Sequence, residues 1–204
     1  MEHVSHIEPV STAITDRELV ERCQRGDAEA FEVLVVRHQQ RALNVAFQLL
    51  RDREDATEVA QDAFVRIYRG MREFRGACEF TTWLHYVVVN LARNKRRWWQ
   101  RRGRHATVSL DCPMAMEDGE VARQVAAPTE SPDAEVARRE FVQALEREMA
   151  ALPVNFREVL VLRNVENLSY EEISVVLECS VGTVKSRIAR AREALREKMQ
   201  VENS

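Results

Sequence analysis

The side chains best suited to chemistry are cations, and they cluster near the middle of the chain. Seven of the twelve residues from Arg93 to Arg104 are Arg or Lys, none is acidic, and Trp98 and Trp99 lie among them. Four more aromatic residues precede this cluster: Phe74, Phe80, Trp83 and Tyr86. Cations bind phosphates and aromatic rings stack on bases, so the segment predicts a site for single-stranded nucleic acid. For Trp83, which recurs at helical spacing, a place in the core is an equally good interpretation.

A second set of cations lies on a helix expected from Val181 to about Met199. Apolar residues at steps of three and four form its buried stripe, and the other face presents Thr183, Lys185, Ser186, Arg187 and Arg190. A short helix through Leu177, opened by the capping box Ser169-Tyr-Glu-Glu172, precedes it across a tight turn. Two helices in this order with a cationic outer face predict a helix-turn-helix, whose second helix enters the DNA major groove.

Helices must also position the N-terminal cations and aromatics. Thr15 and Glu18 form a capping box for a helix that ends near Gly26, and Asp27 and Asp52 are suited to cap the next two. The second helix carries His38 on its apolar stripe, where a packed histidine at the core edge is expected. The third keeps four polar residues off its stripe, namely Glu54, Glu58, Gln61 and Asp62. A fourth helix is expected to begin at Thr81 or Thr82, and Trp98 and Trp99 point about 100° apart, so one core cannot bury both.

The overall composition agrees with an all-α chain of two small domains. Only six of the 204 residues are Gly and five are Pro, and the longest aliphatic runs are about four residues, which excludes a membrane span. Three of the prolines fall between about Thr107 and Pro132, and over residues 107–133 acidic residues outnumber basic ones six to one. This stretch predicts an extended acidic linker. The net charge of -3 conceals a net of -9 over residues 105–179 and +3 on either side.

Several kinds of function are not expected. The four cysteines are widely spaced and suit free thiols in a reducing cytosol rather than disulfides or zinc ligands. No Gly-rich phosphate loop and no carboxylate cluster suited to a catalytic metal is present, so a nuclease or NTPase is a weak alternative and neither cofactor nor metal is predicted. The first ten residues lack the pattern of a secretory signal, which favours a cytoplasmic location.

Three ordered motifs resemble one family, the extracytoplasmic-function (ECF) sigma factors of RNA polymerase, and the sigma-E type in particular. Phe74-Arg-Gly76, Phe80-Thr-Thr-Trp-Leu84 and Asn90-x-x-Arg-Asn94 resemble the segment that recognises the promoter -10 element. The stretch from Asp55 to Phe64 resembles the helix that binds the polymerase clamp. The stretch from Leu168 to Leu195 resembles the helix-turn-helix that recognises the -35 element.

The resemblance implies roles for particular residues. Glu58, Gln61 and Asp62 would bind the coiled coil of the β′ clamp. Phe74 and Asn90, with Phe80 and Trp83 beside them, would surround a pocket for a flipped base of the melted non-template -10 strand. The neighbouring phosphates would be held by Lys95, Arg96 and Arg97. The -35 duplex would be contacted by Thr183, Lys185, Ser186, Arg187 and Arg190.

The resemblance also implies an organisation and a set of partners. It divides the chain into a tail at 1–14, a sigma-2 domain of four helices at 15–105, a linker at 106–134, a sigma-4 domain at 135–199 and a tail at 200–204. The implied partners are core RNA polymerase through its β′ clamp and β subunits, promoter DNA, and an anti-sigma factor that controls a stress response; no catalytic site is implied. The alternative function is a helix-turn-helix regulator that binds duplex DNA alone.

Overall fold

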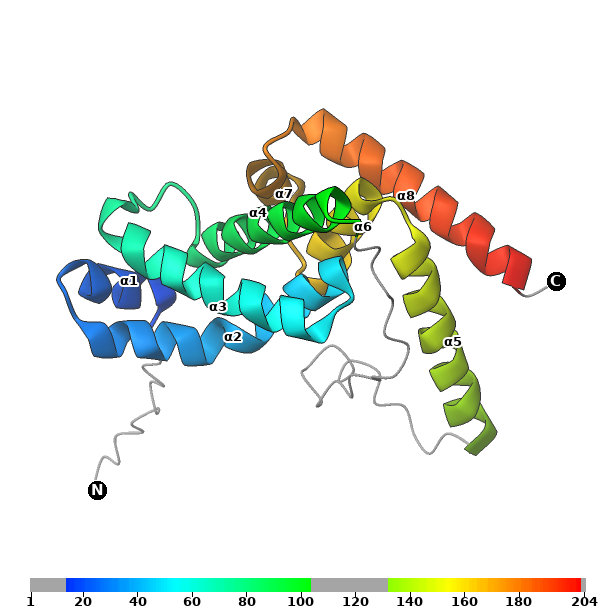
Figure 1. The fold of residues 1–204 in the computed structure, drawn as a ribbon, viewed down its shortest axis with the longest axis horizontal. Helices are drawn as coiled ribbons and strands as arrows, with labels where there is room; N and C mark the ends of the chain where they lie inside the picture. The colour runs from blue at the N-terminus through cyan, green and yellow to red at the C-terminus, as the bar shows by residue number, and fades with distance from the viewer. Residues whose placement is uncertain (1–13, 104–131, 203–204) are drawn as a thin grey trace, which may run out of the picture.

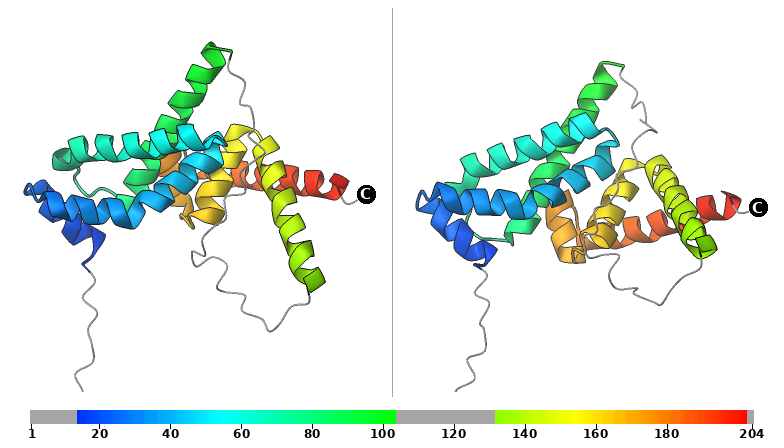
Figure 2. Two further views of the ribbon diagram at one scale, coloured as in Figure 1. Left: turned by 60° about the horizontal axis from the view of Figure 1, so that its bottom comes forward. Right: turned by 90° about the horizontal axis from the view of Figure 1, so that it is seen from below.

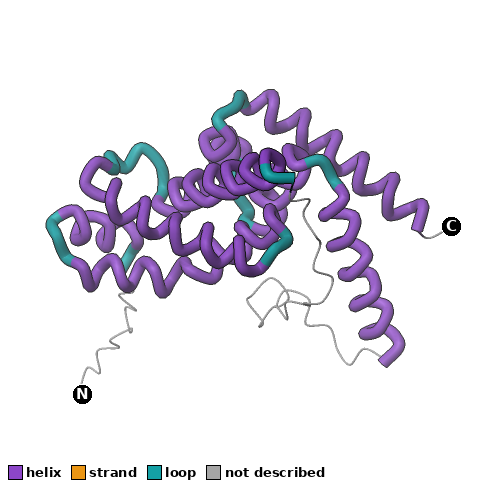
Figure 3. Tube along the Cα trace, in the orientation of Figure 1, coloured by secondary structure: helices purple, strands orange, loops and turns teal. Residues whose placement is uncertain are grey.

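The computed structural model of the protein describes residues 14–103 and 132–202. Every regular element within these two ranges is a helix, which confirms the all-α prediction for them (Figures 1 and 3). The predicted acidic linker falls mainly on residues outside the described part. Helix α5 (Pro132–Ala151) is the first described helix after this stretch. None of the described helices is long and apolar enough to cross a membrane.

The N-terminal domain contains four helices and one 3-10 turn: α1 (Asp16–Gln24), α2 (Ala28–Leu50), α3 (Arg53–Gly70), η1 (Met71–Glu73) and α4 (Phe80–Arg101). The predicted caps are present, since Thr15 and Glu18 form a capping box and Asp27 and Asp52 each accept a backbone N–H bond. These side chains satisfy amide groups that the first helical turn leaves unpaired. Helix boundaries in this domain therefore follow from local sequence.

The predicted apolar stripes meet in one core between α2, α3 and α4. Leu34, Ala63, Ile67 and Leu84 are fully buried there. His38 is 5% exposed, as expected for a packed histidine, and its Nε2 lies 2.7 Å from a carboxylate oxygen of Asp16. Burial lowers the pKa of His38 although Asp16 opposes the shift.

The start of α4 differs from the prediction. The helix begins at Phe80, and Glu79 occupies the N-cap position without a side-chain bond to the helix. Thr82 instead lies inside the helix with 1% exposure, and its hydroxyl donates to Glu172 Oε1 of the C-terminal domain at 3.1 Å. Thr82 is predicted to cap α4 because hydroxyl side chains favour the N-cap position. In the structure Thr82 lies three residues beyond the N-cap, and its hydroxyl bonds to Glu172 instead.

The C-terminal domain contains α5, α6 (Val154–Leu160), a π-helical turn η2 (Val161–Val165), α7 (Tyr170–Leu177) and α8 (Val181–Glu202). The apolar run from Val154 to Val165 predicts a single helix, whereas the structure widens its second half into a π turn. The Ser169–Glu172 capping box is present, and Glu178 turns the chain toward α8 with φ of 52°. Of the predicted stripe of α8, Val184, Ile188 and Ala191 are buried, and Leu195 is half-buried against the core.

The two domains lie against each other through α4. Helix α7 packs on α4 on one side and on α8 on the other, and α6 touches α2 (Figures 1 and 2). Helices α5 and α8 extend away from the N-terminal domain, and the C-terminal end of α4 projects beyond α2 and α3 in both views of Figure 2. The last residues of α4, Gln100 and Arg101, are exposed, while Trp99 beside them stays in the core.

Candidate nucleic-acid and polymerase interfaces

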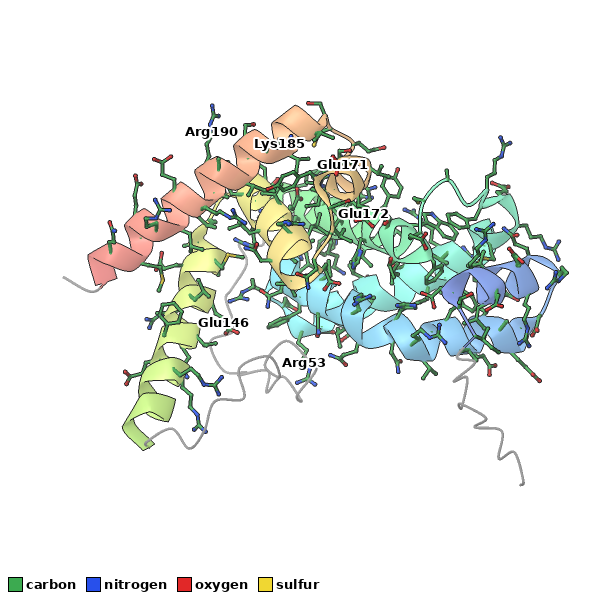
Figure 4. The ribbon with its side chains drawn as sticks, turned by 180° about the vertical axis from the view of Figure 1, so that it is seen from behind. Arg53, Glu146, Glu171, Glu172, Lys185 and Arg190 are labelled. Atoms are coloured by element: carbon green, nitrogen blue, oxygen red, sulfur yellow. The ribbon has the colours of Figure 1, made fainter. Side chains whose placement is uncertain are left out.

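The outer face of α8 is the simplest of the predicted surfaces, because one helix supplies all of it. Lys185, Ser186 and Arg190 are exposed, while Thr183 and Arg187 are half-buried. Arg190 points away from the body of the molecule, and Lys185 lies on the side nearer α7 (Figure 4). The Lys185 ammonium sits 5.9 Å from the centre of the Tyr170 ring of α7.

The hydroxyl groups at the start of α8 already have partners within the helix. Ser180 Oγ accepts from the Thr183 amide at 3.1 Å and lies 2.9 Å from the Thr183 hydroxyl. The Ser186 hydroxyl donates to the Thr183 carbonyl at 3.0 Å. The cations Lys185 and Arg190 are thus the predicted residues that α8 presents most freely to a duplex.

The predicted -10 site combines a loop with the first turns of α4. The ring of Phe74 stacks on that of Trp83 at 4.5 Å between centroids and 10° between planes. Gln24 of α1 holds the start of this loop, because its side-chain amide donates to the carbonyls of Met71 and Phe74 at 3.2 and 2.6 Å. Gly76 continues the loop with φ of 68°, a conformation that favours glycine. The aromatic pair is half-buried, with one part in the core and one part at the surface.

Phe80 is not available as a surface contact in this structure. It is 3% exposed, and its ring meets Trp83 edge-on at 6.4 Å and His38 at 5.3 Å. The prediction placed Phe80 with Trp83 because both flank the motif, but the helix turns Phe80 toward α2. Phe80 therefore supports Trp83 from behind, as a positioning residue.

Asn90 lies near Trp83 on the helical repeat of α4 and is half-buried. Its neighbour one turn earlier is Tyr86, whose hydroxyl donates to Glu178 Oε1 of the C-terminal domain at 3.2 Å. Burial and the negative charge of Glu178 raise the pKa of Tyr86, while a hydrogen bond with Asn90 opposes the shift. The C-terminal domain thus reaches the edge of the predicted base pocket.

The cation-rich end of α4 does not form the uniform phosphate site that the sequence suggested. Lys95 pairs with Asp55 at 2.8 Å and Glu58 at 2.5 Å; burial acts against its charge, but these two carboxylates raise its pKa. Arg96 is half-buried, and burial lowers its pKa. Arg97 is exposed and donates to Asn94 Oδ1 at 2.8 Å. Of the three predicted phosphate contacts, Arg97 is the one that the structure presents to solvent.

The two tryptophans separate as predicted, because Trp99 is 5% exposed and Trp98 is half-buried. The guanidinium of Arg102 lies 4.5 Å from the centre of the Trp98 ring, and the ammonium of Lys95 lies 5.8 Å from it. Such cation–π contacts hold long side chains over a ring. Trp98 therefore orders Arg102 at the projecting end of α4.

The predicted polymerase surface is exposed on α3. Glu58, Gln61 and Asp62 all lie outside the core, as the helical repeat required. Two apolar residues of the same helix are also exposed, Val65 at 48% and Tyr68 at 56%. Both lie off the predicted apolar stripe of this helix, and no motif in the sequence singled them out. Tyrosine is among the residue types that are enriched at protein interfaces, so Tyr68 adds a suitable side chain to this surface.

Sequence analysis also missed a set of polar contacts between the domains. Arg93 donates two hydrogen bonds to Glu158, at 2.8 and 2.7 Å. Glu166 lies 3.0 Å from His85 Nε2 and 3.0 Å from Arg41. The sequence signal for these contacts was Glu158, a glutamate in the apolar run 154–165. A charge buried in such a run needs a partner.

The comparisons with known proteins match both domains. The model for sigma-70 region 2 matches residues 34–104, and that for sigma-70 region 4 matches residues 142–195. The RNA polymerase sigma-H factor of Pseudomonas aeruginosa is 38% identical over 185 residues, which cover 91% of this chain and 94% of that protein. The ECF RNA polymerase sigma-E factor of Escherichia coli K12 is 37% identical over 191 residues, covering 94% and 97%. The chain belongs to the ECF sigma factors.

Solved structures agree with this sigma factor fold. CnrH in complex with the cytosolic domain of CnrY has a TM-score of 0.65 and 25% identity, covering 91% of this chain and 97% of CnrH. The sigma factor RpoE in complex with the anti-sigma factor NepR, from Bartonella quintana, has a TM-score of 0.62 at 20% identity and shares the fold. This chain is therefore an alternative sigma factor that directs promoter-specific initiation by RNA polymerase, and a lone helix-turn-helix regulator is not favoured because region 2 is present too.

Proposed function

We propose that this sigma factor recognises its promoter through two separate surfaces of different character. The face of α8 with Lys185, Ser186 and Arg190 binds the -35 duplex, with Thr183 and Arg187 at its edges. The pocket of Phe74, Trp83 and Asn90 binds a flipped base of the -10 strand. Arg and Lys recognise guanine edges in a major groove, whereas a ring and an amide suit an unstacked base.

The stacked pair of Phe74 and Trp83 is the observation that carries the -10 assignment. Two parallel rings 4.5 Å apart at the surface, one anchored on α4 and one in a loop held by Gln24, offer an aromatic platform beside a side-chain amide. Stacking of a base on such a ring contributes about 1–3 kcal/mol. Arg97 lies about two turns beyond Asn90 on α4, where the next phosphates of the strand would pass.

The polymerase contact is assigned to α3, through Glu58, Gln61 and Asp62, with β′ as the partner subunit and β as a second contact for the C-terminal domain. An anti-sigma factor is the proposed regulator, and the similarity to a sigma factor solved with NepR supports it. The sigma factor performs no reaction of its own and works in the cytoplasm with the polymerase, which supplies the chemistry.

Run-off transcription tests this function directly. Core RNA polymerase with the sigma factor should produce a transcript of defined length from promoter DNA selected by this complete polymerase, and core polymerase alone should not. The Trp83→Ala variant should bind core polymerase but produce no transcript. Promoter binding by the free protein without any specific transcript in the complete reaction would contradict the proposal.

A further inference from the structure

The cations near the end of α4 do not all belong to the same surface. Arg97 is exposed, whereas the Lys95 ammonium lies against α3, 2.8 Å from Asp55 Oδ1 and 2.5 Å from Glu58 Oε2. Asp55 and Glu58 are three residues apart on α3, so one turn of that helix presents both carboxylates to the same cation. Lys95 therefore joins α4 to the helix that carries the proposed polymerase surface.

Asp55 is the residue that fixes Lys95 in this place. The Asp55 side chain is 7% exposed, and its second oxygen, Oδ2, is buried without a hydrogen-bond partner in the described part of the chain. A buried carboxylate that loses its cation is strongly destabilising. Burial acts to lower the pKa of Lys95, but the bonds to Asp55 and Glu58 raise it, so the ammonium stays charged. Lys95 is thus the counterion of Asp55 and is not free to follow a nucleic-acid strand.

Glu58 shares this ammonium but lies at the surface. Its side chain is 57% exposed, in contrast to that of Asp55. An exposed glutamate samples several rotamers, and a partner that binds it must supply the free energy needed to fix one of them. Because Asp55 holds Lys95, the bond from Lys95 restricts the rotamers of Glu58 before any partner arrives. The exposed carboxylate is therefore pre-organised.

Trp98 contacts the same ammonium. The centre of its ring lies 5.8 Å from Lys95 Nζ and 4.5 Å from the guanidinium carbon of Arg102. These three residues recur on α4 at steps of three and four, so they form one stripe of the helix. A cation over an aromatic ring is held there by the charge distribution of the ring. Trp98 thus helps to keep Lys95 beside the two carboxylates of α3.

From these contacts we propose that Lys95 is a positioning residue for the polymerase surface and not a phosphate contact of the -10 strand. Asp55 fixes the Lys95 ammonium, and the ammonium holds the Glu58 carboxylate ready for the clamp. The basic end of α4 therefore serves two partners, because Lys95 acts toward polymerase through Glu58 while Arg97 faces the strand. This inference rests on the proposed polymerase contact of Glu58.

Binding of the full-length factor to core polymerase, measured by competition against labelled wild-type factor, tests the proposal. Lys95→Met keeps an unbranched side chain but removes the charge, and it should weaken binding by about three- to tenfold because Glu58 must then be ordered on binding. Lys95→Arg keeps a cation beside both carboxylates and should bind nearly as tightly as the wild type. Arg101→Met removes an exposed cation of the same helix and should leave the affinity near the wild-type value. Equal losses in Lys95→Met and Arg101→Met would overturn the proposal.

A double-mutant cycle with Glu58→Gln shows whether Lys95 acts through Glu58. Adding Lys95→Met to Glu58→Gln should lower polymerase affinity little further, whereas adding it to Gln61→Ala should multiply the two losses. Multiplied losses in both pairs would overturn the positioning role. Wild-type affinity in Glu58→Gln would refute the proposed polymerase contact of Glu58 and the role of Lys95 with it. A loss in Glu58→Gln without a loss in Lys95→Met would refute the role of Lys95 alone.

A second variant keeps the test decisive if Lys95→Met loses helicity by circular dichroism, since Asp55 would then lack its cation. The combination of Asp55→Asn with Lys95→Met removes the buried charge together with its partner and nearly conserves both side-chain volumes, so it should retain the fold. It should weaken polymerase binding as much as the loss of Lys95 predicts. Wild-type polymerase affinity in this folded double variant would overturn the proposal.

Binding of the -10 strand separates Lys95 from Arg97. The probe is the labelled non-template strand of promoter DNA selected by the complete polymerase, and fluorescence anisotropy measures its binding to core polymerase assembled with excess factor. Arg97→Met should weaken strand binding and make its salt dependence shallower, because a phosphate contact is lost. Lys95→Met should do neither. Equal changes in the two variants would make Lys95 a phosphate contact and overturn the proposal.

Discussion

The two promoter-binding surfaces are built in opposite ways. The -35 surface is one face of α8, and its cations Lys185 and Arg190 stand free of the rest of the protein. The -10 surface needs a loop, Gln24 of α1 and the start of α4, and Glu178 of the C-terminal domain lies at its border. A surface made by one helix follows from local sequence, whereas a composite surface depends on every element that holds it. Substitutions should therefore have local effects on the first surface and distributed effects on the second.

Trp83→Ala should give the largest effect. It removes a half-buried ring that stacks on Phe74 and packs over Phe80, so the free energy of unfolding should fall by about 2 kcal/mol, below the 3–5 kcal/mol of fully buried aromatics. Promoter melting at -10 should be lost, as measured by permanganate reactivity of thymines, while -35 binding persists. Trp83→Phe is the control and should retain part of both properties. Unchanged stability would show that the ring is not integral to the fold.

Arg190→Ala should act on the other surface without touching the fold. Loss of a guanidinium that contacts a base should weaken -35 binding by about 1–3 kcal/mol and relax specificity at one position, with the melting temperature unchanged. Arg196→Ala, on the same helix nearly two turns further on, is the matched control for charge. A uniform loss across all sequences, together with a shallower salt dependence, would make Arg190 a phosphate contact instead.

Gln61→Ala combined with Asp62→Ala should weaken binding to core polymerase by about five- to tenfold, or about 1 kcal/mol and slightly more. Both side chains are exposed on α3, so helicity by circular dichroism should not change. Glu54→Ala, nearer the start of the same helix, is the comparison for a general effect of negative charge. Undiminished polymerase affinity would show that Gln61 and Asp62 do not contribute to binding. Val65 and Tyr68 would then be the residues of α3 to test next.

The smallest expected effect is the loss of stability at low pH that follows from protonation of Glu172. Burial acts against the charge of Glu172, but hydrogen bonds from Ser169 and Thr82 lower its pKa below 4.5. A carboxyl with a lowered pKa contributes stability that is present above 4.5 and is lost as the pH falls through the folded-state value. The melting temperatures of the wild type and of Glu172→Gln should therefore converge between pH 5 and about pH 3. A constant difference between the two melting temperatures over this pH range would show that the ionised Glu172 carboxylate is not the source of the added stability.

Much of the helical framework was accessible from the sequence because the signals were local. These signals use residues within four positions of one another: the capping boxes at Thr15 and Ser169, the caps at Asp27 and Asp52, and the stripe of α8. The errors occurred where distant residues intervene. Thr82 suited a cap but bonds to Glu172, and the run from Val154 to Val165 suited one helix but widens into a π turn.

The candidate sites divide along the same line. The sequence alone determined that the chain is helical, that α8 carries a cationic face opposite its apolar stripe, and that four polar residues of α3 lie outside the core, because helical periodicity decides each of these. Only the tertiary structure decided that Phe80 is buried, that Lys95 is held by Asp55 and Glu58, and that four glutamates face α4. The reason is physical: the availability of a charge depends on which distant partner burial places beside it, and no spacing along one helix encodes that partner.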